Sequence, residues 1–153
     1  MSEAKKLITV FGATGAQGGS VVRQLLKDGR FAVRGVTRDA KAEKAEALRA
    51  LGVEVVAGDL LDAASAEAAM AGSYGVFIVT SFWELGAEKE AKQGQIAAEV
   101  AAKVKPQHVV FSGLEDTGKW NVPHFTIKAR IEEQFKAAGV PVTFVHAAFY
   151  LEN

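Results

Sequence analysis

Three glycines at intervals of three residues separate an apolar run from a segment with helical spacing. They stand in Gly12-Ala-Thr-Gly15-Ala-Gln-Gly18, directly after the apolar residues 7–11. In a strand–loop–helix unit, the first glycine allows a tight turn, the second lets a pyrophosphate approach the backbone, and the third lets the helix pack closely on the strand. The free N–H groups and the positive dipole end of the helix attract phosphate. The spacing therefore predicts a dinucleotide-binding loop.

Charged residues at the end of the next apolar run bear on the choice of nucleotide. An acidic residue at this place favours NAD by binding the ribose hydroxyls, whereas this chain has Arg38 and Lys41, with Asp39 between them. The planar guanidinium of Arg38 can bind a 2′-phosphate through two parallel hydrogen bonds. Asp39 could still reach a ribose, and all three residues could instead form a solvated charged loop. We expect NADP(H) as the cofactor.

Composition excludes several other kinds of chemistry. The chain has no cysteine, which excludes disulfides, thiol nucleophiles and thiolate metal sites. Its His, Asp and Glu residues show no metal-ligand spacing, so we expect no metal. The 18 Lys and Arg residues balance 18 Asp and Glu residues, which argues against a nucleic-acid-binding surface. The first apolar run is too short for a signal peptide or a membrane span. We expect a cytoplasmic protein, with the nucleus as an alternative, and no membrane partner.

Short apolar runs alternate with longer segments of helical periodicity along the whole chain. The runs show little polar alternation, which is typical of strands in a parallel sheet covered on both faces. Right-handed crossovers between such strands favour a Rossmann-type doubly wound α/β fold, with strand order 3-2-1-4-5-6 and helices on both faces. No linker or repeat divides residues 1–153, so we expect a single domain. The expected strands are residues 7–11, 32–37, 53–57, 75–79, 107–112 and 141–146, and the expected helices are residues 17–28, 42–51, 63–70, 88–104 and 125–138.

One connecting segment is long for this fold. Residues 113–123 predict a functional or mobile loop. We place Trp120 in that loop and Trp83 in the loop after the fourth strand, both on the cofactor side of the sheet. Aromatic side chains at these places could line a pocket or a partner surface, or could simply pack the loops.

Motifs along the whole chain resemble the NmrA-like group of atypical short-chain dehydrogenase relatives. The resemblance is greatest to the NmrA-like-domain proteins that are proposed to sense the NADP/NADPH ratio. The motifs occur in the order of the family and leave no large part of the chain without a match. They are Phe11-Gly-Ala-Thr-Gly-Ala-Gln-Gly-Gly19, Val36-Thr-Arg38, Gly58-Asp59, Phe77-Ile-Val-Thr80, Lys92-Gln-Gly94, Ser112-Gly-Leu-Glu115 and Tyr150-Leu-Glu-Asn153.

The resemblance implies a set of residues that bind NADP(H) from one end to the other. Arg38 would meet the 2′-phosphate, and Asp59 and Leu60 would face the adenine. For Asp59 a helix cap is the alternative, although Asp62 suits that cap better. The pyrophosphate would lie on Gly12, Ala13, Thr14, Gly15, Ala16 and Gln17, and the nicotinamide half on Thr80, Ser81, Phe82, Lys92, Lys128, Tyr150, Leu151, Glu152 and Asn153.

The catalytic motif of the wider superfamily is incomplete in this chain. Typical short-chain dehydrogenases use a serine with a Tyr-x-x-x-Lys pair, and here Ser112 and Lys128 are present but His124 stands at the tyrosine position. The NmrA-like sensors carry the same replacement and are thought to lack dehydrogenase activity. The isoflavone-reductase-like enzymes, however, resemble the segment around Lys128 and use that lysine with NADPH. Lys128 is therefore a candidate for proton transfer, but the missing tyrosine favours a ligand of the nicotinamide ribose.

Family members normally continue beyond the Tyr-Leu-Glu-Asn motif into a smaller domain that closes over the nicotinamide. This chain ends at Asn153, so we expect it to lack the C-terminal substrate subdomain. The leading hypothesis is an NADP(H)-binding regulatory or redox-sensor domain with a degenerate dehydrogenase site, read by a regulatory protein partner. The alternatives are an NADPH-dependent reductase that uses Lys128 and an interaction module that binds no nucleotide. The sequence names neither a substrate nor an oligomeric state.

Overall fold

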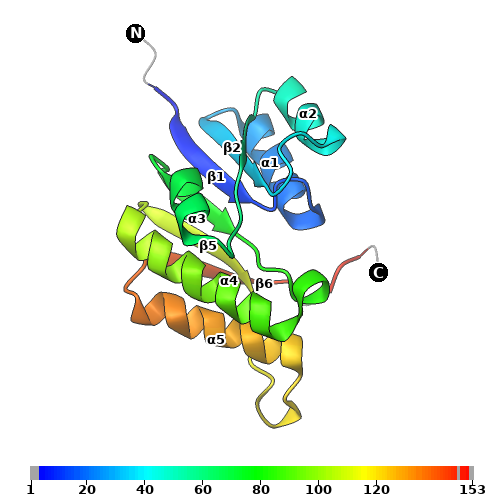
Figure 1. The fold of residues 1–153 in the computed structure, drawn as a ribbon, viewed down its shortest axis with the longest axis vertical. Coiled ribbons are helices and arrows are strands. Elements are labelled where there is room, and N and C mark those ends of the chain that lie inside the picture. The colour runs from blue at the N-terminus through cyan, green and yellow to red at the C-terminus, as the bar shows by residue number, and fades with distance from the viewer. Residues whose placement is uncertain (1–3, 148, 152–153) are drawn as a thin grey trace.

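Strands and helices alternate along the chain (Figure 1). The computed structural model describes residues 4–147 and 149–151. Within them, the elements are β1 (Lys6–Phe11), α1 (Ala16–Asp28), β2 (Phe31–Thr37), α2 (Glu43–Ala50), β3 (Glu54–Ala57), α3 (Ala63–Met70), β4 (Gly75–Ile78), α4 (Phe82–Val104), β5 (His108–Gly113), the short 3₁₀ helix η1 (Gly118–Trp120), α5 (Pro123–Ala137) and β6 (Val142–His146).

The strands of the described residues form one parallel sheet in the order β3-β2-β1-β4-β5-β6. In this register Phe11 of β1 lies opposite Val36 of β2, and Ile78 of β4 lies opposite Phe111 of β5. All strands point the same way, so their carboxyl ends meet at one edge of the sheet. The predicted Rossmann-type fold and its strand order are confirmed.

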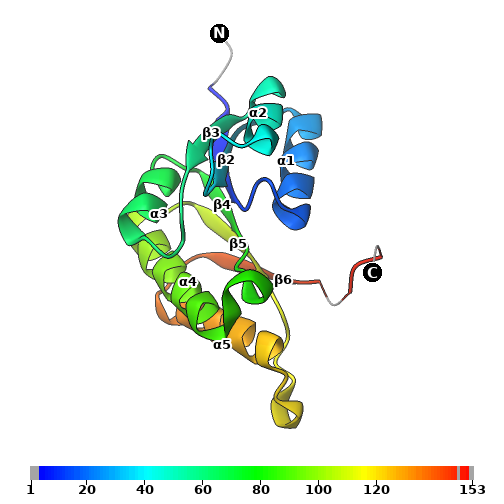
Figure 2. The ribbon, with the colours of Figure 1, turned by 45° about the vertical axis from the view of Figure 1, so that its right-hand side comes forward.

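Helices cover both faces of the sheet. Figures 1 and 2 show α1 and α2 on one side and α3, α4 and α5 on the other. Consecutive residues of a strand point to opposite faces, so Val10 of β1 packs in the core under α1 and α2, while Phe11 packs in the larger core under the other three helices. Burying each such side chain contributes about 1.5–3 kcal/mol. The two cores explain why the strands are apolar without alternation.

The start of α4 differs from the prediction. The helix begins at Phe82 rather than at residue 88, and it is broken at Gly86, whose φ of 79° and ψ of 173° are not helical. Glycine adopts this left-handed backbone without the strain that a Cβ would bring. The break separates a short first turn from the long helix whose periodicity the sequence displays. Trp83 therefore lies in a helical turn and not in a loop, and Trp120 lies in η1.

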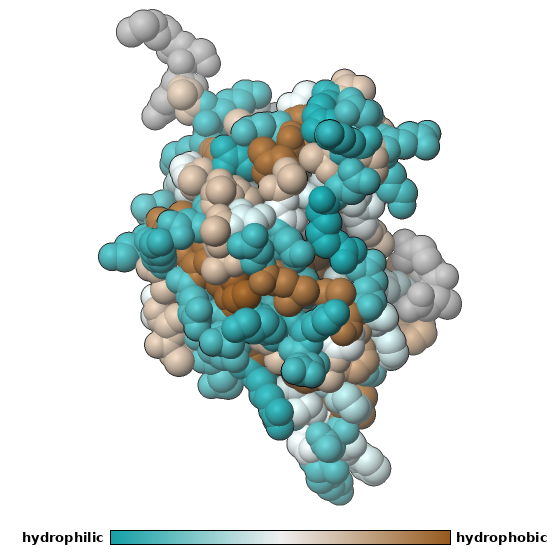
Figure 3. All heavy atoms as spheres, in the orientation of Figure 1, coloured by the Kyte–Doolittle hydropathy of each residue, from teal (hydrophilic) through white to brown (hydrophobic). Residues whose placement is uncertain are grey.

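Hydrophilic and hydrophobic side chains share the face of the molecule that Figure 3 shows. In the orientation of Figure 3, a hydrophobic band crosses the middle of the visible face, between hydrophilic regions above and below it. Several large apolar side chains are exposed on the molecule as a whole, including Trp83 at 81% and Trp120 at 75%. Across the described part of the chain, no helix combines the length and the hydropathy needed to span a bilayer.

Candidate functional site

A cavity of about 740 Å³ opens at the carboxyl edge of the sheet. Its walls come from the loop after β1, the ends of β2, β4 and β5, the segment after β3, the first turns of α4 and α5, and the segment after β6. The strand order reverses between β1 and β4, and such a switch point is where open α/β sheets bind their ligands. The volume lies in the range of sites for cofactors and small molecules.

The glycine loop has the geometry that its spacing predicts. Gly12 has φ of 66°, which glycine adopts most readily, and a Cβ on Gly18 would lie 2.1 Å from the carbonyl oxygen of Gly12. Only glycine at position 18 lets α1 pack this closely on the end of β1. Gly15 is the N-cap of α1, it lines the cavity, and a Cβ there would lie 3.3 Å from the same oxygen. The loop therefore leaves an open approach to the free amides at the start of α1.

Arg38 is the cation that β2 brings to the cavity. Its Nη2 donates to Oε2 of Glu84, in the first turn of α4, over 2.8 Å, and both side chains are more than half exposed. Asp39 and Lys41 do not line the cavity; Oδ1 of Asp39 accepts a hydrogen bond from the amide of Lys41 at 2.9 Å and closes their own turn. Of the three charged residues considered for nucleotide choice, the structure brings only Arg38 to the site.

Asp59 and Leu60 line the cavity after β3, where the adenine was expected. Asp59 accepts a hydrogen bond from the amide of Leu61 at 2.8 Å, so its carboxylate stabilises the turn in which it lies. The cap of α3 is Asp62, whose carboxylate accepts from the amides of Ala64 and Ser65. The preference for Asp62 over Asp59 as the helix cap is therefore confirmed.

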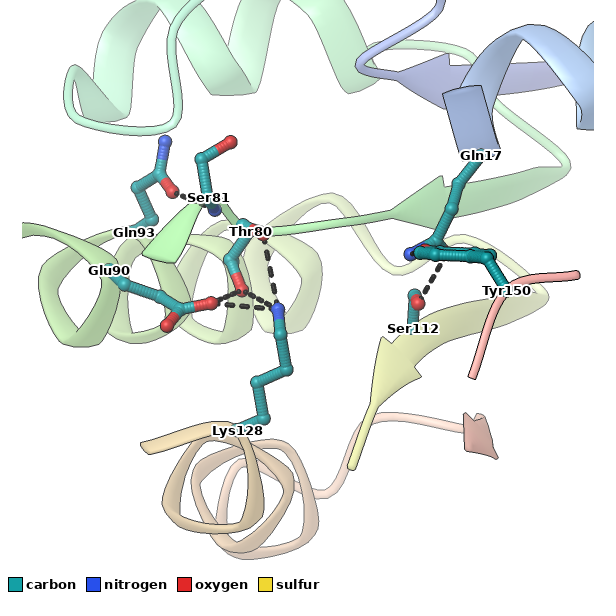
Figure 4. Close-up of polar contacts among 8 residues, drawn as sticks. All are labelled: Gln17, Thr80, Ser81, Glu90, Gln93, Ser112, Lys128 and Tyr150. Carbon is teal, nitrogen blue, oxygen red and sulfur yellow. Dashed lines mark hydrogen bonds and ion pairs between the residues drawn. The ribbon is translucent and has the colours of Figure 1, made fainter. Parts of the chain in front are cut away.

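Lys128 of α5 points at the end of β4 and not into open solvent (Figure 4). Its Nζ lies 2.7 Å from Oε1 of Glu90, 3.0 Å from the hydroxyl of Thr80 and 3.1 Å from the carbonyl oxygen of Thr80. The Thr80 hydroxyl in turn donates to Oε1 of Glu90 at 2.7 Å. An ammonium has three N–H donors, and these three acceptors use all of them.

Glu90 and Gln93 are site residues that the sequence reasoning missed. Glu90 is fully buried, and its second oxygen, Oε2, has no hydrogen-bond partner among the described residues. Gln93 lines the cavity and accepts from the amide of Ser81 at 3.0 Å (Figure 4). Their positions share the inward face of α4 with Gly94 and Ala97. Two polar residues at the spacing of a buried apolar stripe were the signal that could have identified them.

Ser112, Gln17 and Tyr150 form a second polar cluster, which joins three distant segments (Figure 4). The hydroxyl of Ser112, at the end of β5, donates to Oε1 of Gln17 at 2.5 Å, and Nε2 of Gln17 donates to the hydroxyl of Tyr150. The segment after β6 thus returns to the start of α1. Three of the residues that the resemblance associated with the cofactor or the catalytic motif therefore meet at the cavity.

Aromatic rings line the mouth of the cavity beside Lys128. The ring of His124 lies 5.0 Å from that of Trp83 and 5.6 Å from that of Phe82, measured between centroids. His124 stands one helical turn before Lys128, and all four side chains line the cavity. The position of the missing tyrosine is therefore occupied by an imidazole packed against aromatic rings.

Some of the expected ligands lie elsewhere. Lys92 is exposed on α4 and does not line the cavity, because the inward face of that helix carries Glu90 and Gln93 instead. Leu151 is fully exposed and is also absent from the lining, while Glu152 and Asn153 are outside the described residues. Most of the other predicted residues line the cavity: Gly12, Thr14, Gly15, Ala16, Gln17, Arg38, Asp59, Leu60, Thr80, Ser81, Phe82, Lys128 and Tyr150.

Ala13, which was expected at the pyrophosphate, belongs to the hydrophobic core instead. It is 1% exposed, its amide donates to the carbonyl oxygen of Val36 at 3.2 Å, and its side chain packs in the core under α1 and α2. It is not part of the cavity lining. In the described part of the chain, no group of three or more His, Cys, Asp or Glu residues is arranged to hold a metal ion.

The sheet, its switch point and the glycine loop define a Rossmann-type dinucleotide-binding domain. The chain matches the NmrA-like family over residues 4–153, and it belongs to that family. It is 35% identical to the NmrA-like family domain-containing oxidoreductase cpsB of Aspergillus campestris, over 99% of this chain and 48% of that protein.

Two solved structures show what related sites hold. The triphenylmethane reductase of Citrobacter sp., complexed with NADP(H), is 26% identical with a TM-score of 0.84, over 95% of this chain and 50% of that one. The negative transcriptional regulator NmrA, in complex with NADP, is 29% identical with a TM-score of 0.82, over 97% of this chain and 47% of that one; NmrA has also been solved with NAD. The chain spans about half the length of these relatives.

Proposed function

We propose that this chain is an NADP(H)-binding regulatory domain whose dehydrogenase site is degenerate. The glycine loop supports the binding half of the proposal, since Gly15 leaves the start of α1 open and Arg38 stands at the cavity as a cation for a 2′-phosphate. Gln17, Asp59 and Tyr150 offer polar groups along the same cavity. The related reductase and the regulator NmrA, both solved with NADP, support the same cofactor.

The hydrogen bonding of Lys128 is the observation that supports a regulatory role rather than catalysis. Its three donors are used by Glu90 and Thr80, and His124 replaces the tyrosine that would transfer a proton. A substrate oxygen or a ribose hydroxyl can reach this ammonium only by exchanging with one of those acceptors. A bound nicotinamide would supply a hydride, but the Lys128 ammonium, with its three donors engaged, is not free to donate the proton that completes a reduction. This arrangement favours a regulatory role, in which a protein partner binds differently according to the nucleotide that the domain holds.

A second candidate function is an NADPH-dependent reductase that works through Lys128. It is supported by the place of Lys128 in the cavity wall and by the relatives, several of which are named as oxidoreductases. In this function Glu90 and Thr80 would orient the ammonium, and Phe82, Trp83 and His124 would form the apolar side of a substrate site.

Titration calorimetry with NADP, NADPH and NAD tests the binding half of the proposal. We expect both NADP forms to bind, and to bind more tightly than NAD. If none of the three binds, the chain is an interaction module and the proposal fails. Turnover of NADPH, considered in the Discussion, separates the regulator from the reductase.

A further inference from the structure

Arg38 and Glu84 form an ion pair across the open side of the cavity. Arg38 follows β2, and Glu84 lies 46 residues later in the first turn of α4. Both residues line the cavity, and their side chains are 57% and 61% exposed. The pair therefore joins the wall at the end of β2 to the wall after β4, where solvent can replace either partner.

Glu84 accepts a hydrogen bond from the same Arg38 guanidinium that a 2′-phosphate would bind. A phosphate is best bound by two parallel N–H groups of an arginine, and one of the Arg38 nitrogens, Nη2, already donates to the Glu84 carboxylate over 2.8 Å. A phosphate that binds here meets a carboxylate of the same charge sign within the same contact. It must displace Glu84 or share the cation with it.

A ribose without a 2′-phosphate does not need to displace Glu84 from Arg38. With NAD bound, Arg38 can keep its pair with Glu84, so no charge is left without a partner. Asp39 does not compete, because it accepts from the amide of Lys41 and does not line the cavity. Lys41 is exposed and outside the lining, so it offers no second cation at the cavity wall.

We propose that Glu84 weakens the preference for NADP(H) over NAD(H) by competing with the 2′-phosphate for Arg38. The inference rests on the proposed nucleotide binding and adds a residue that lowers the preference for NADP. Exposed ion pairs change an equilibrium constant by about two- to fivefold. We therefore expect Glu84→Gln to raise the affinity for NADP by about that factor and to leave the affinity for NAD unchanged.

The test compares 2′,5′-ADP with 5′-AMP, which differ by the 2′-phosphate alone, together with NADP and NAD, by calorimetry. Glu84→Gln is measured beside Glu88→Gln, a matched change at an exposed glutamate of the same helix that does not line the cavity. Only Glu84→Gln should tighten the two 2′-phosphorylated ligands. In an Arg38→Gln background the same substitution should have no effect. The gain should also shrink in high salt, because exposed charges are screened.

Four results would count against the inference. Equal effects of Glu84→Gln on NADP and NAD, or an equal gain from Glu88→Gln, would overturn it while the proposed function stood. A gain that persists in the Arg38→Gln background would also overturn it, because Glu84 would then act without Arg38. If the unaltered chain binds none of the four ligands, the proposed function fails and the inference fails with it.

Discussion

Lys128 of α5 and Glu90 of α4 form an ion pair at the wall of the cavity, with 2.7 Å between Nζ and Oε1. The Glu90 side chain is completely buried, and that of Lys128 is 12% exposed. A buried carboxylate is stable only beside a compensating charge and hydrogen bonds. The pair therefore fixes where the ammonium stands, and it links the two helices to the end of β4 through Thr80.

Removing either partner of this pair should destabilise the fold. We expect Lys128→Met to lower the free energy of unfolding by about 3–5 kcal/mol, because it leaves the Glu90 carboxylate buried without its counter-charge. The double variant Lys128→Met/Glu90→Gln should recover much of this loss. Urea denaturation measures the free energies of unfolding of these two variants and of Glu90→Gln alone. The control is Lys103→Met, which breaks the exposed pair of Lys103 with Glu67 and should change the stability by less than about 1 kcal/mol. Additive effects of the two buried substitutions would contradict the coupling.

The unaltered chain should bind NADPH without oxidising it. The reasons are the occupied donors of Lys128 and the imidazole at the tyrosine position. The measurement is the loss of NADPH absorbance over a panel of carbonyl and quinone acceptors, with binding shown separately by calorimetry. The matched variant is Lys128→Met/Glu90→Gln, which removes the lysine without leaving an unpaired buried carboxylate. Turnover that disappears in this variant would establish the reductase instead of the regulator.

Arg38→Asp should weaken NADP more than NAD. The substitution removes a charge-assisted bond to the 2′-phosphate and adds repulsion, and a bond of this kind contributes about 1.5–3 kcal/mol. Calorimetry with the two nucleotides gives the difference directly. Equal weakening of both would show that Arg38 does not recognise the 2′-phosphate.

Substitutions in the glycine loop should separate folding from binding. Gly15→Val should abolish nucleotide binding, because its side chain would stand where a pyrophosphate approaches the start of α1. The fold should survive, because the Cβ contact of 3.3 Å with the Gly12 oxygen needs a much smaller adjustment than the contact of 2.1 Å at Gly18. Gly18→Ala should destabilise the fold itself, since its Cβ would lie 2.1 Å from the same oxygen.

Gly19→Ala is the control for these loop variants. A Cβ at Gly19 makes contacts of 3.4 Å, and the position lies in α1 outside the cavity lining. It should preserve binding and raise stability by the difference in helix propensity, about 1 kcal/mol. Circular dichroism melts and calorimetry measure the two properties. Normal binding by Gly15→Val would place the nucleotide away from this loop.

Local chemistry by itself determined the fold and the geometry of the glycine loop. The apolar strands, the helical periods between them and the spacing of Gly12, Gly15 and Gly18 are short-range features, and the structure agrees with each of them. The preference for Asp62 as the cap of α3 could be predicted for the same reason, because a cap bonds to amides only two or three residues away. The helical turn that begins at Phe82, before the break at Gly86, could not be predicted, because a single turn has too few residues to display a helical period.

Only the tertiary structure decided which charges meet. Lys128 and Glu90 are 38 residues apart, and Arg38 and Glu84 are 46 residues apart, so nothing in the local sequence couples them. Their contacts depend on how α4 and α5 are rotated and placed against the sheet, and packing of the buried core sets that rotation. The same rotation turns Glu90 inward and leaves Lys92, two residues later, in solvent. The exposed pair of Arg38 with Glu84 follows from packing, because an exposed ion pair contributes too little energy to direct it.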